Sequence, residues 1–367
     1  MKYDIAAYIW PSYTGKEIRT RIFWPDGEGE WQTVRQAGAR YEGHDWPRRP
    51  LLGYKDEADP ATMAEQIDLA ATHGVNVFIY DWYWYDRRPF LENCLNDGYL
   101  PAAHKDPRVK FYLMWANHDA GMTWDKRNAD RQFLPEPQPP VWRGDQDINE
   151  FRIICKRLIE RYFFDPLYYT IDGKPVFSIY ECSSLRKGLG GIYETRKALD
   201  EFREMCVKAG LPGLHLQLVL THPVTANHST ATTPSICNAL GFDSITHYQY
   251  VHFTGAGRPY AEALEDVCKE WEAVPSAYGI PYYPHVSVGW DASPRFLEYT
   301  GGTFLNNTPE IFGEAMRRAC RYADAHPEDP PLITVNSWNE WTEGSYLLPD
   351  DLHGYGYLDE IRKIQQL

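Results

Sequence analysis

Short runs of apolar residues recur along the chain, and each run ends where polar and aromatic side chains begin. Runs that are apolar at almost every position are typical of strands buried on both faces, as in a parallel sheet covered by helices. The pattern predicts strands at residues 4–10, 75–80, 109–115, 176–180, 214–220, 244–250, 283–288 and 332–335.

Between these runs, apolar residues return every three to four positions, which is the spacing of an amphipathic helix. Gly74 and Gly210 stand where two of these helices should stop. Helices are predicted at residues 61–73, 90–96, 148–163, 193–209, 235–240, 260–273, 309–325 and 356–366.

Eight strand-then-helix units in 367 residues predict an α/β fold, with one catalytic (β/α)₈ barrel domain over residues 1–367. Two loops are long, at residues 11–60 after the first strand and 118–147 after the third. The main alternative is an open, doubly wound sheet, which would hold a nucleotide in its crevice. No GxGxxG or P-loop sequence follows any predicted strand, so the barrel is preferred.

Polar or aromatic residues occupy all eight predicted strand ends, where barrels of this kind place their catalytic groups. Each also has a structural interpretation, since a histidine at a strand end is often a satisfied hydrogen-bonding residue and an aspartate can cap a loop. The residues predicted to bind substrate are Tyr8, Trp10, Asp81, Trp82, Trp84, Asn117, His118, Glu181, His222, Tyr248, Tyr250, His285, Trp290, Asn336 and Trp338.

The last predicted strand runs directly into the sequence NSWNEWTEG at residues 336–344. Glu340 and Glu343 stand three positions apart, and on a strand such residues point to opposite faces. Both reach one cleft only if the chain leaves the strand near Asn339 and turns, which Gly344 favours. Two carboxylates at an aromatic-lined site are what cleavage of a glycosidic bond requires, so Glu340 and Glu343 are the predicted catalytic residues.

Composition points in the same direction. Aromatic residues make up 15% of the chain, with 13 Trp and 26 Tyr, and such side chains suit the flat faces and hydroxyls of sugars. A tyrosine-rich core is the alternative reading of this excess. The formal net charge is −14 and no basic patch is present, so we expect an oligo- or polysaccharide partner and no nucleic acid.

Seven cysteines are scattered without a CxxC pair, which favours reduced thiols over disulfides or a zinc ribbon. The histidines lack HxH or HExxH spacing, so no metal is predicted. The sequence shows neither a signal peptide nor an apolar run of 18 residues, so no membrane span is expected. This fits a cytoplasmic protein, or a periplasmic one whose export signal has been removed.

Several stretches resemble the WbsX-type proteins, which are similar to the endo-α-mannosidases of glycoside hydrolase family 99. The resemblance runs from the first strand to the C-terminus and is most specific in the NSWNEWTEG motif. The matching stretches are Phe78–Tyr85, Met114–Asn117, Ile171–Phe177, Asn336–Gly344 and Tyr355–Leu358.

This resemblance implies a (β/α)₈ barrel that acts on a glycan without a cofactor. It implies that Glu340 is a base that takes the proton of a sugar 2-hydroxyl, whose oxygen then attacks the anomeric carbon to give a 1,2-anhydro sugar. Glu343 would be the general acid, with a raised pKa, and later the base that activates water. Thr342 departs from the histidine of the mannosidases, and the first loop does not match them, so the resemblance does not fix the substrate.

Three functions are therefore carried forward. The preferred one is a retaining, endo-acting hydrolase of an α-linked bacterial or plant-type polysaccharide, with inversion as the stereochemical alternative. The second is a glycosyltransferase of O-antigen-type polysaccharide synthesis, a label also given to WbsX proteins, although no DxD motif follows a Rossmann-like strand. The third is a catalytically silent sugar-binding barrel, in which the two carboxylates diverge or Glu343 is paired with an arginine.

Overall fold

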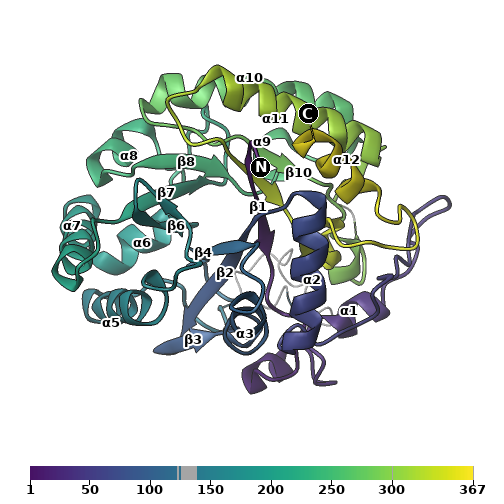
Figure 1. The fold of residues 1–367 in the computed structure, drawn as a ribbon, viewed down its shortest axis with the longest axis horizontal. Coiled ribbons are helices and arrows are strands. Elements are labelled where there is room, and N and C mark those ends of the chain that lie inside the picture. The colour runs from purple at the N-terminus through teal and green to yellow at the C-terminus, as the bar shows by residue number, and fades with distance from the viewer. Residues whose placement is uncertain (122–123, 125–138, 300, 367) are drawn as a thin grey trace.

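Eight parallel strands form the centre of the computed structural model, which describes residues 1–121, 124, 139–299 and 301–366 (Figure 1). Their order around the sheet is β10-β12-β1-β2-β4-β6-β7-β8. A parallel bridge between Ile245 and Tyr282 joins the two ends of this order, so the sheet is nearly closed into the predicted barrel. The strands are β1 (Asp4–Ile9), β2 (Val77–Tyr85), β4 (Lys110–Trp115), β6 (Lys174–Ile179), β7 (His215–Leu220), β8 (Ser244–His247), β10 (His285–Ser287) and β12 (Leu332–Asn336).

Helices cover the outside of this barrel, as the apolar spacing predicted (Figure 1). Their starts follow capping chemistry, because the side chains of Asp59 and Asp147 accept hydrogen bonds from the first free backbone N–H groups of α2 and α5. Gly74 ends α2 in the left-handed conformation, with φ of 93°. The α-helices are α1 (Trp31–Arg35), α2 (Pro60–His73), α3 (Leu100–Ala103), α5 (Ile148–Leu158), α6 (Cys182–Leu189), α7 (Ile192–Ala209), α8 (Pro234–Leu240), α9 (Val251–Thr254), α10 (Tyr260–Tyr278), α11 (Pro309–Ala325) and α12 (Gly356–Gln365).

Short strands and helical turns lie in the segments between the barrel strands and the covering helices. The antiparallel pair β13 (Asn339–Glu340) and β14 (Ser345–Tyr346) follows β12, and the NSWNEWTEG motif runs from the last residue of β12 through β13 to Gly344. The 3₁₀-helical turns are η1 (Ile18–Ile22), η6 (Ser293–Arg295) and η7 (Trp341–Glu343), and the π-helical segments are η2 (Cys94–Tyr99) and η5 (Ile159–Phe163). The remaining strands are β3 (Arg88–Phe90), β5 (Thr170–Ile171), β9 (Arg258–Pro259), β11 (Phe304–Leu305), β13 (Asn339–Glu340) and β14 (Ser345–Tyr346).

Besides the strand predicted at 75–80, which as β2 extends to Tyr85, two predicted elements differ from the structure. The helix predicted at residues 90–96 is wrong in its position, because Arg88–Phe90 pairs with the extended end of β2 and the helical turns begin only at Cys94. The strand predicted at 244–250 ends at His247, since the chain turns there into α9. Both errors lie at strand ends, where an aromatic-rich sequence does not distinguish a longer strand from a turn.

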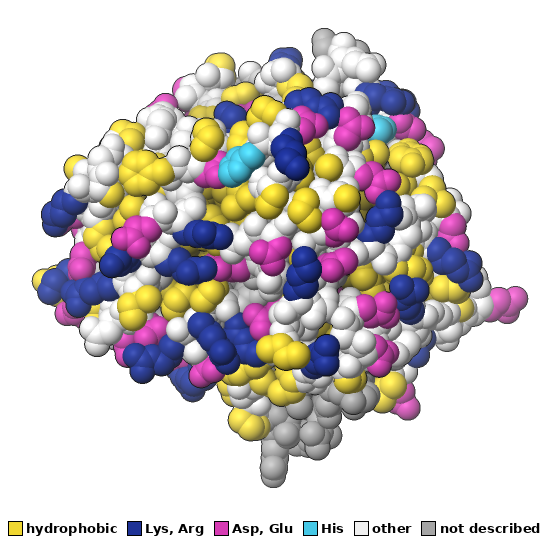
Figure 2. Space-filling view, turned by 60° about the horizontal axis from the view of Figure 1, so that its bottom comes forward, with side chains coloured by type: hydrophobic (Ala, Val, Ile, Leu, Met, Phe, Trp, Pro, Cys, Tyr) yellow, Lys and Arg dark blue, Asp and Glu magenta, His cyan; other side chains and the backbone are white. Residues whose placement is uncertain are grey.

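Neither sign of charge dominates the face of the molecule that Figure 2 shows. Basic and acidic side chains are interspersed in the view of Figure 2, and many of them form ion pairs, such as Arg152 with Glu201. No described helix is long and apolar enough to cross a membrane. All seven cysteines are free thiols, as their spacing predicted.

Candidate functional site

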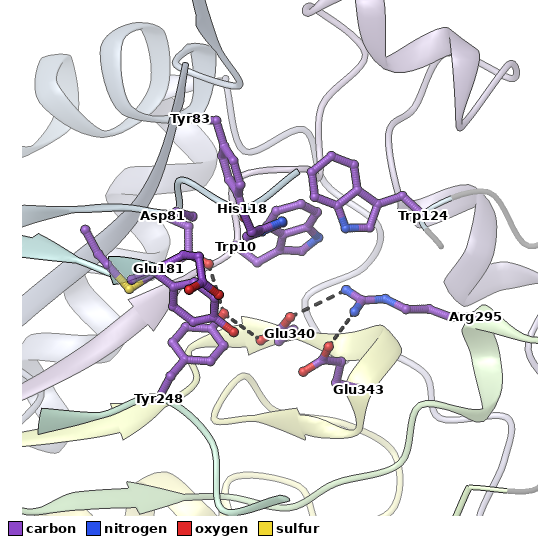
Figure 3. A pocket seen from close by; sticks show the side chains of 13 residues that line it. Trp10, Asp81, Tyr83, His118, Trp124, Glu181, Tyr248, Arg295, Glu340 and Glu343 are labelled. Carbon is purple, nitrogen blue, oxygen red and sulfur yellow. Dashed lines mark hydrogen bonds and ion pairs between the residues drawn. The ribbon is translucent and has the colours of Figure 1, made fainter. Parts of the chain in front are cut away.

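A cavity of about 360 Å³ opens at the C-terminal ends of the barrel strands (Figure 3). Acidic and aromatic side chains from seven separate parts of the chain meet in it, because parallel strands bring their carboxyl ends to one mouth. The cavity is lined by Trp10, Asp81, Tyr83, Met114, Ala116, His118, Trp124, Tyr180, Glu181, Tyr248, Arg295, Glu340 and Glu343.

The turn after β12 brings both predicted catalytic glutamates to this cavity. Glu340 ends β13, and Trp341–Glu343 forms a single 3₁₀ turn that closes at Gly344 with φ of 59°. In such a turn, residues three apart lie nearly above one another, so Glu340 and Glu343 share a side of the chain. The predicted departure from the strand is confirmed, and it begins with Ser337, whose hydroxyl accepts the backbone N–H of Glu340 at 2.7 Å.

Glu340 is surrounded by hydrogen-bond donors. Its Oε2 accepts from the Tyr248 hydroxyl at 3.1 Å and from the Asn336 amide at 3.3 Å, and its Oε1 lies 3.4 Å from Nη2 of Arg295. Gln249 holds Asn336 in place through a bond of 2.8 Å to its Oδ1. Burial raises the pKa of Glu340, while Arg295 and the two neutral donors oppose the rise by favouring the carboxylate.

Glu343 has a different environment. Nη1 of Arg295 donates to its Oε1, and the Glu340 carboxyl is its second hydrogen-bonding neighbour. Burial and the neighbouring Glu340 carboxylate raise the pKa of Glu343 well above its ordinary value, although Arg295 acts in the opposite direction. The pKa of both glutamates is thus raised by burial, and the rise is larger at Glu343.

Arg295 belongs to a buried ionic cluster that includes a third glutamate. Glu30, which is fully buried, lies 3.3 Å from Nε of Arg295, and the Thr342 hydroxyl bonds both Glu30 at 2.9 Å and Arg295 at 2.9 Å. Trp10 also donates its ring N–H to Glu30. One guanidinium therefore faces three glutamates, which leaves at least one of them without a compensating charge.

The pairing of Arg295 with Glu343 is the arrangement expected of a silent sugar-binding barrel. Either arrangement alone would satisfy that hypothesis, and this one is present; the alternative arrangement, divergence of the carboxylates, is absent, because Glu340 and Glu343 line the same cavity (Figure 3). The pairing also engages only Oε1 of Glu343. A carboxyl group bound in this way still has a second oxygen for a transferable proton.

Aromatic rings form the walls around these acids. The Trp10 ring lies 5.6 Å from Tyr83 and 5.2 Å from Trp124, measured between ring centroids. His118 stands against the same Trp124 ring at 5.9 Å, and burial lowers the pKa of this histidine, so its neutral form is favoured. Flat apolar walls above hydrogen-bonding carboxylates match the two kinds of surface that a sugar ring presents.

Seven of the predicted site residues line the cavity, namely Trp10, Asp81, His118, Glu181, Tyr248, Glu340 and Glu343. Three more support them from behind. Asn336 holds Glu340, Asn117 forms two bonds of 2.8 Å with the backbone of Glu181, and the Tyr8 ring packs 4.8 Å from Tyr248.

Three predicted tryptophans point away from the cavity. In β2 the side chains alternate, so Asp81 faces the cavity while Trp82 and Trp84 face outward. Their ring N–H groups donate to Glu92 at 2.7 Å and Glu150 at 3.1 Å, respectively. Trp338 likewise donates to Gln66 of α2 at 2.7 Å.

The other four predicted residues lie elsewhere in the fold. His285 bonds Thr334 and Ser287 inside the barrel, and Nε2 of His222 accepts the backbone N–H of Thr232. Tyr250 packs against Tyr260 and Phe304, while Trp290 lines a separate cavity of about 250 Å³.

Sequence reasoning missed six lining residues, which are Tyr83, Met114, Ala116, Trp124, Tyr180 and Arg295. Tyr83 and Met114 could have been predicted, because alternate residues of a strand lie on the same face. Tyr83 is two positions after Asp81, and Met114 is two positions before Ala116. Arg295 carried no such signal, since it comes from a turn within an irregular segment. Among the described residues, no group of three His, Cys, Asp or Glu side chains is placed to hold a metal ion.

Solved structures of carbohydrate-active barrels share this fold. The GH99 endo-α-mannosidase from Bacteroides thetaiotaomicron, in complex with Bis-Tris propane, matches with a TM-score of 0.62 at 15% identity, over 99% of this chain and 96% of that one. A glycoside hydrolase-like protein matches with the same TM-score at 14% identity, over 99% of this chain and 93% of that one.

The sequence model of the family described as "Glycosyltransferase WbsX" matches residues 5–361, and the chain belongs to this family. The uncharacterized protein WxcX from two strains of Xanthomonas campestris pv. campestris is 25% identical over 349 residues, which cover 93% of this chain. They cover 46% of WxcX, so the chain spans about half the length of these curated relatives.

Removal of one aromatic wall tests whether this cavity binds sugar. Trp124→Ala is expected to weaken binding of an accepted oligosaccharide by on the order of tenfold or more, because it removes a large buried ring from the cavity. Isothermal titration calorimetry measures this loss. Trp290→Ala is the matched control, since Trp290 lines the other cavity, and equal losses in both variants would contradict the assignment.

Proposed function

We propose that the protein is a retaining glycoside hydrolase that cleaves α-linked polysaccharide at internal positions. The observation that supports this best is the contrast between the two glutamates of one cavity. Glu340 accepts hydrogen bonds from Tyr248, Asn336 and Arg295, whereas Glu343 is bound by Arg295 through one oxygen only. A base and an acid with different environments are what general acid–base cleavage requires.

In the first step, Glu340 removes the proton from the hydroxyl beside the anomeric carbon. The oxygen so released attacks the anomeric carbon, the glycosidic bond breaks, and Glu343 gives its proton to the leaving oxygen. In the second step, Glu343 takes a proton from water, and the water oxygen attacks the anomeric carbon of the 1,2-anhydro sugar. The three-membered ring opens, and the oxygen of the former hydroxyl takes its proton back from Glu340. Both glutamates return to their starting states, and no cofactor takes part in either step.

Arg295 fits this sequence as a residue that stabilises the acid after it has reacted. Glu343 becomes a carboxylate as it gives up its proton, and Nη1 of Arg295 already contacts its Oε1. A favourable interaction that grows as charge develops stabilises the transition state more than the ground state. Glu30 and Thr342 hold the guanidinium in place through Nε.

The pH dependence of kcat/KM tests the two roles together. Glu340 must be ionised, so activity is lost as the pH falls through its pKa, which burial raises. Glu343 must be protonated, so activity is lost as the pH rises through its own raised pKa. We expect a bell-shaped profile whose acid limb lies above the range of an exposed glutamate, about 4.3. A profile without an alkaline limb would contradict the role of Glu343.

The family description supports a second candidate, a glycosyltransferase that uses a nucleotide-sugar. Such a donor carries a diphosphate, which needs cationic or metal partners. Of the described residues that line the cavity, Arg295 is the one arginine or lysine, and it is already engaged by Glu30, Glu340 and Glu343. We therefore prefer hydrolysis.

Calorimetry and product analysis separate the two candidates. Hydrolysis predicts new reducing ends when the protein is incubated with a panel of α-linked polysaccharides, and no saturable binding of UDP-, GDP- or dTDP-sugars. Saturable binding of a nucleotide-sugar, with transfer of its sugar to an acceptor glycan, would overturn the hydrolase proposal in favour of the transferase.

A further inference from the structure

Asp81 is an acidic residue of the cavity that the two-glutamate mechanism does not use. It lies in the middle of β2, one residue before the parallel pairing with β4 ends, and only 3% of its surface is exposed. Its Oδ2 is 2.9 Å from the Tyr248 hydroxyl, and its Oδ1 is buried without a hydrogen-bond partner in the described structure. A carboxylate in that position would have one neutral donor at most, which is a costly way to bury a charge.

Tyr248 stands between two acids, with its hydroxyl 2.9 Å from Asp81 and 3.1 Å from Oε2 of Glu340 (Figure 3). A phenol has one proton, so it donates to only one of these oxygens at a time. If both acids were ionised, a lone pair of the Tyr248 oxygen would face the carboxylate that receives no proton, and this second contact would be repulsive. Both contacts are hydrogen bonds only if one of the acids carries a proton and donates it to the phenol oxygen.

The surroundings decide which acid carries this proton. Glu340 has two further donors, Arg295 and Asn336, whereas Asp81 forms no ion pair with any described residue. Burial and the nearby Glu340 and Glu343 raise the pKa of Asp81 well above its ordinary value, and the bond from Tyr248 opposes this only in part. The titratable groups that face Asp81 from the packed elements are Tyr8, Tyr83, Tyr180, Tyr248, Glu340 and Glu343.

We propose that Asp81 is a neutral carboxylic acid in the resting protein, that it donates its proton to the Tyr248 oxygen, and that it thereby directs the Tyr248 hydroxyl toward Glu340. Asp81 is thus a positioning residue that keeps the base ionised and aimed. Were Asp81 ionised, its unpaired charge would draw the Tyr248 proton away from Glu340. The role in catalysis rests on the proposed function, whereas the protonation state of Asp81 does not.

Infrared difference spectroscopy of the full chain at pH 7 tests the protonation without any substrate. Subtracting the spectrum of Asp81→Asn from that of the unchanged protein is expected to reveal the C=O stretch of one protonated carboxylic acid. Asp145→Asn is the matched control and should reveal ionised-carboxylate bands, since Arg143 lowers the pKa of Asp145 despite partial burial. Ionised-carboxylate bands from Asp81→Asn as well would overturn the proposal.

Kinetics with a polysaccharide that the protein cleaves test whether Asp81 positions Tyr248. Asp81→Ala is expected to lower kcat on the order of tenfold to a hundredfold through misdirection of Tyr248. Asp81→Asn should recover most of that loss, because its amide N–H can donate to Tyr248 as the neutral acid does. Equal activity of the two variants would overturn the positioning role.

If Asp81→Ala does not fold, Tyr248→Phe replaces it, with the same expected loss. If no polysaccharide is cleaved, the proposed function fails while the infrared result still decides the state of Asp81.

Discussion

Replacement of Glu343 by Gln is expected to lower kcat for polysaccharide by on the order of 10²–10⁴-fold, while the protein stays folded. Gln keeps the side-chain shape and an oxygen for the Arg295 contact, but it has no proton to give to the leaving oxygen. Release of reducing ends measures turnover, and thermal unfolding measures the fold.

The choice of leaving group separates loss of the acid from general damage. An aryl glycoside of the accepted sugar with a nitrophenol leaving group departs without protonation, so Glu343→Gln should cleave it with a much smaller loss. Glu28→Gln is a suitable control, because Glu28 is a partly exposed loop residue paired with Arg35. Near-normal polysaccharide turnover by Glu343→Gln would remove Glu343 as the acid.

Replacement of Glu340 by Gln is expected to cause a comparable loss, also on the order of 10²–10⁴-fold in kcat. Its cause is different, because the amide cannot accept the proton of the attacking hydroxyl. The Gln oxygen can still accept hydrogen bonds from Tyr248 and Asn336, so the cavity should keep its shape, while the contact with Arg295, whose Nη2 is also a donor, is lost.

The aryl glycoside distinguishes this variant from the first. A good leaving group does not replace a missing base, so Glu340→Gln should be as slow on the nitrophenyl substrate as on polysaccharide. Recovery with the activated substrate would show that Glu340 acts on the leaving group instead, and the two roles would then be exchanged.

The barrel was predictable because each strand is apolar on both faces and each helix has an apolar stripe. The position of the site followed from the same topology, since Glu340 comes four residues after β12 and Asp81 stands where the parallel pairing of β2 with β4 ends. The outward direction of Trp82 and Trp84 was also available in principle, by alternation from Asp81. The prediction instead placed Trp82 and Trp84 in the site together with Asp81, although they lie on the opposite face of the strand.

The ionic cluster behind the glutamates was beyond the reach of the sequence. Glu30 and Arg295 are separated by 265 positions, and both lie in irregular segments between strands. Charged residues in such segments usually face solvent, and nothing in their spacing marks them as buried partners. Their meeting depends on how the loop after β1 folds over the barrel mouth.

Hydrolysis of α-linked polysaccharide in H₂¹⁸O, followed by mass spectrometry of the new reducing ends, tests the central claim most directly. The account predicts that each cleavage places one ¹⁸O at the new anomeric carbon, that the α anomer appears first, and that Glu343→Gln suppresses the label. Sugar binding to the cavity without any labelled product across the panel, or transfer from a nucleotide-sugar in its place, would contradict it.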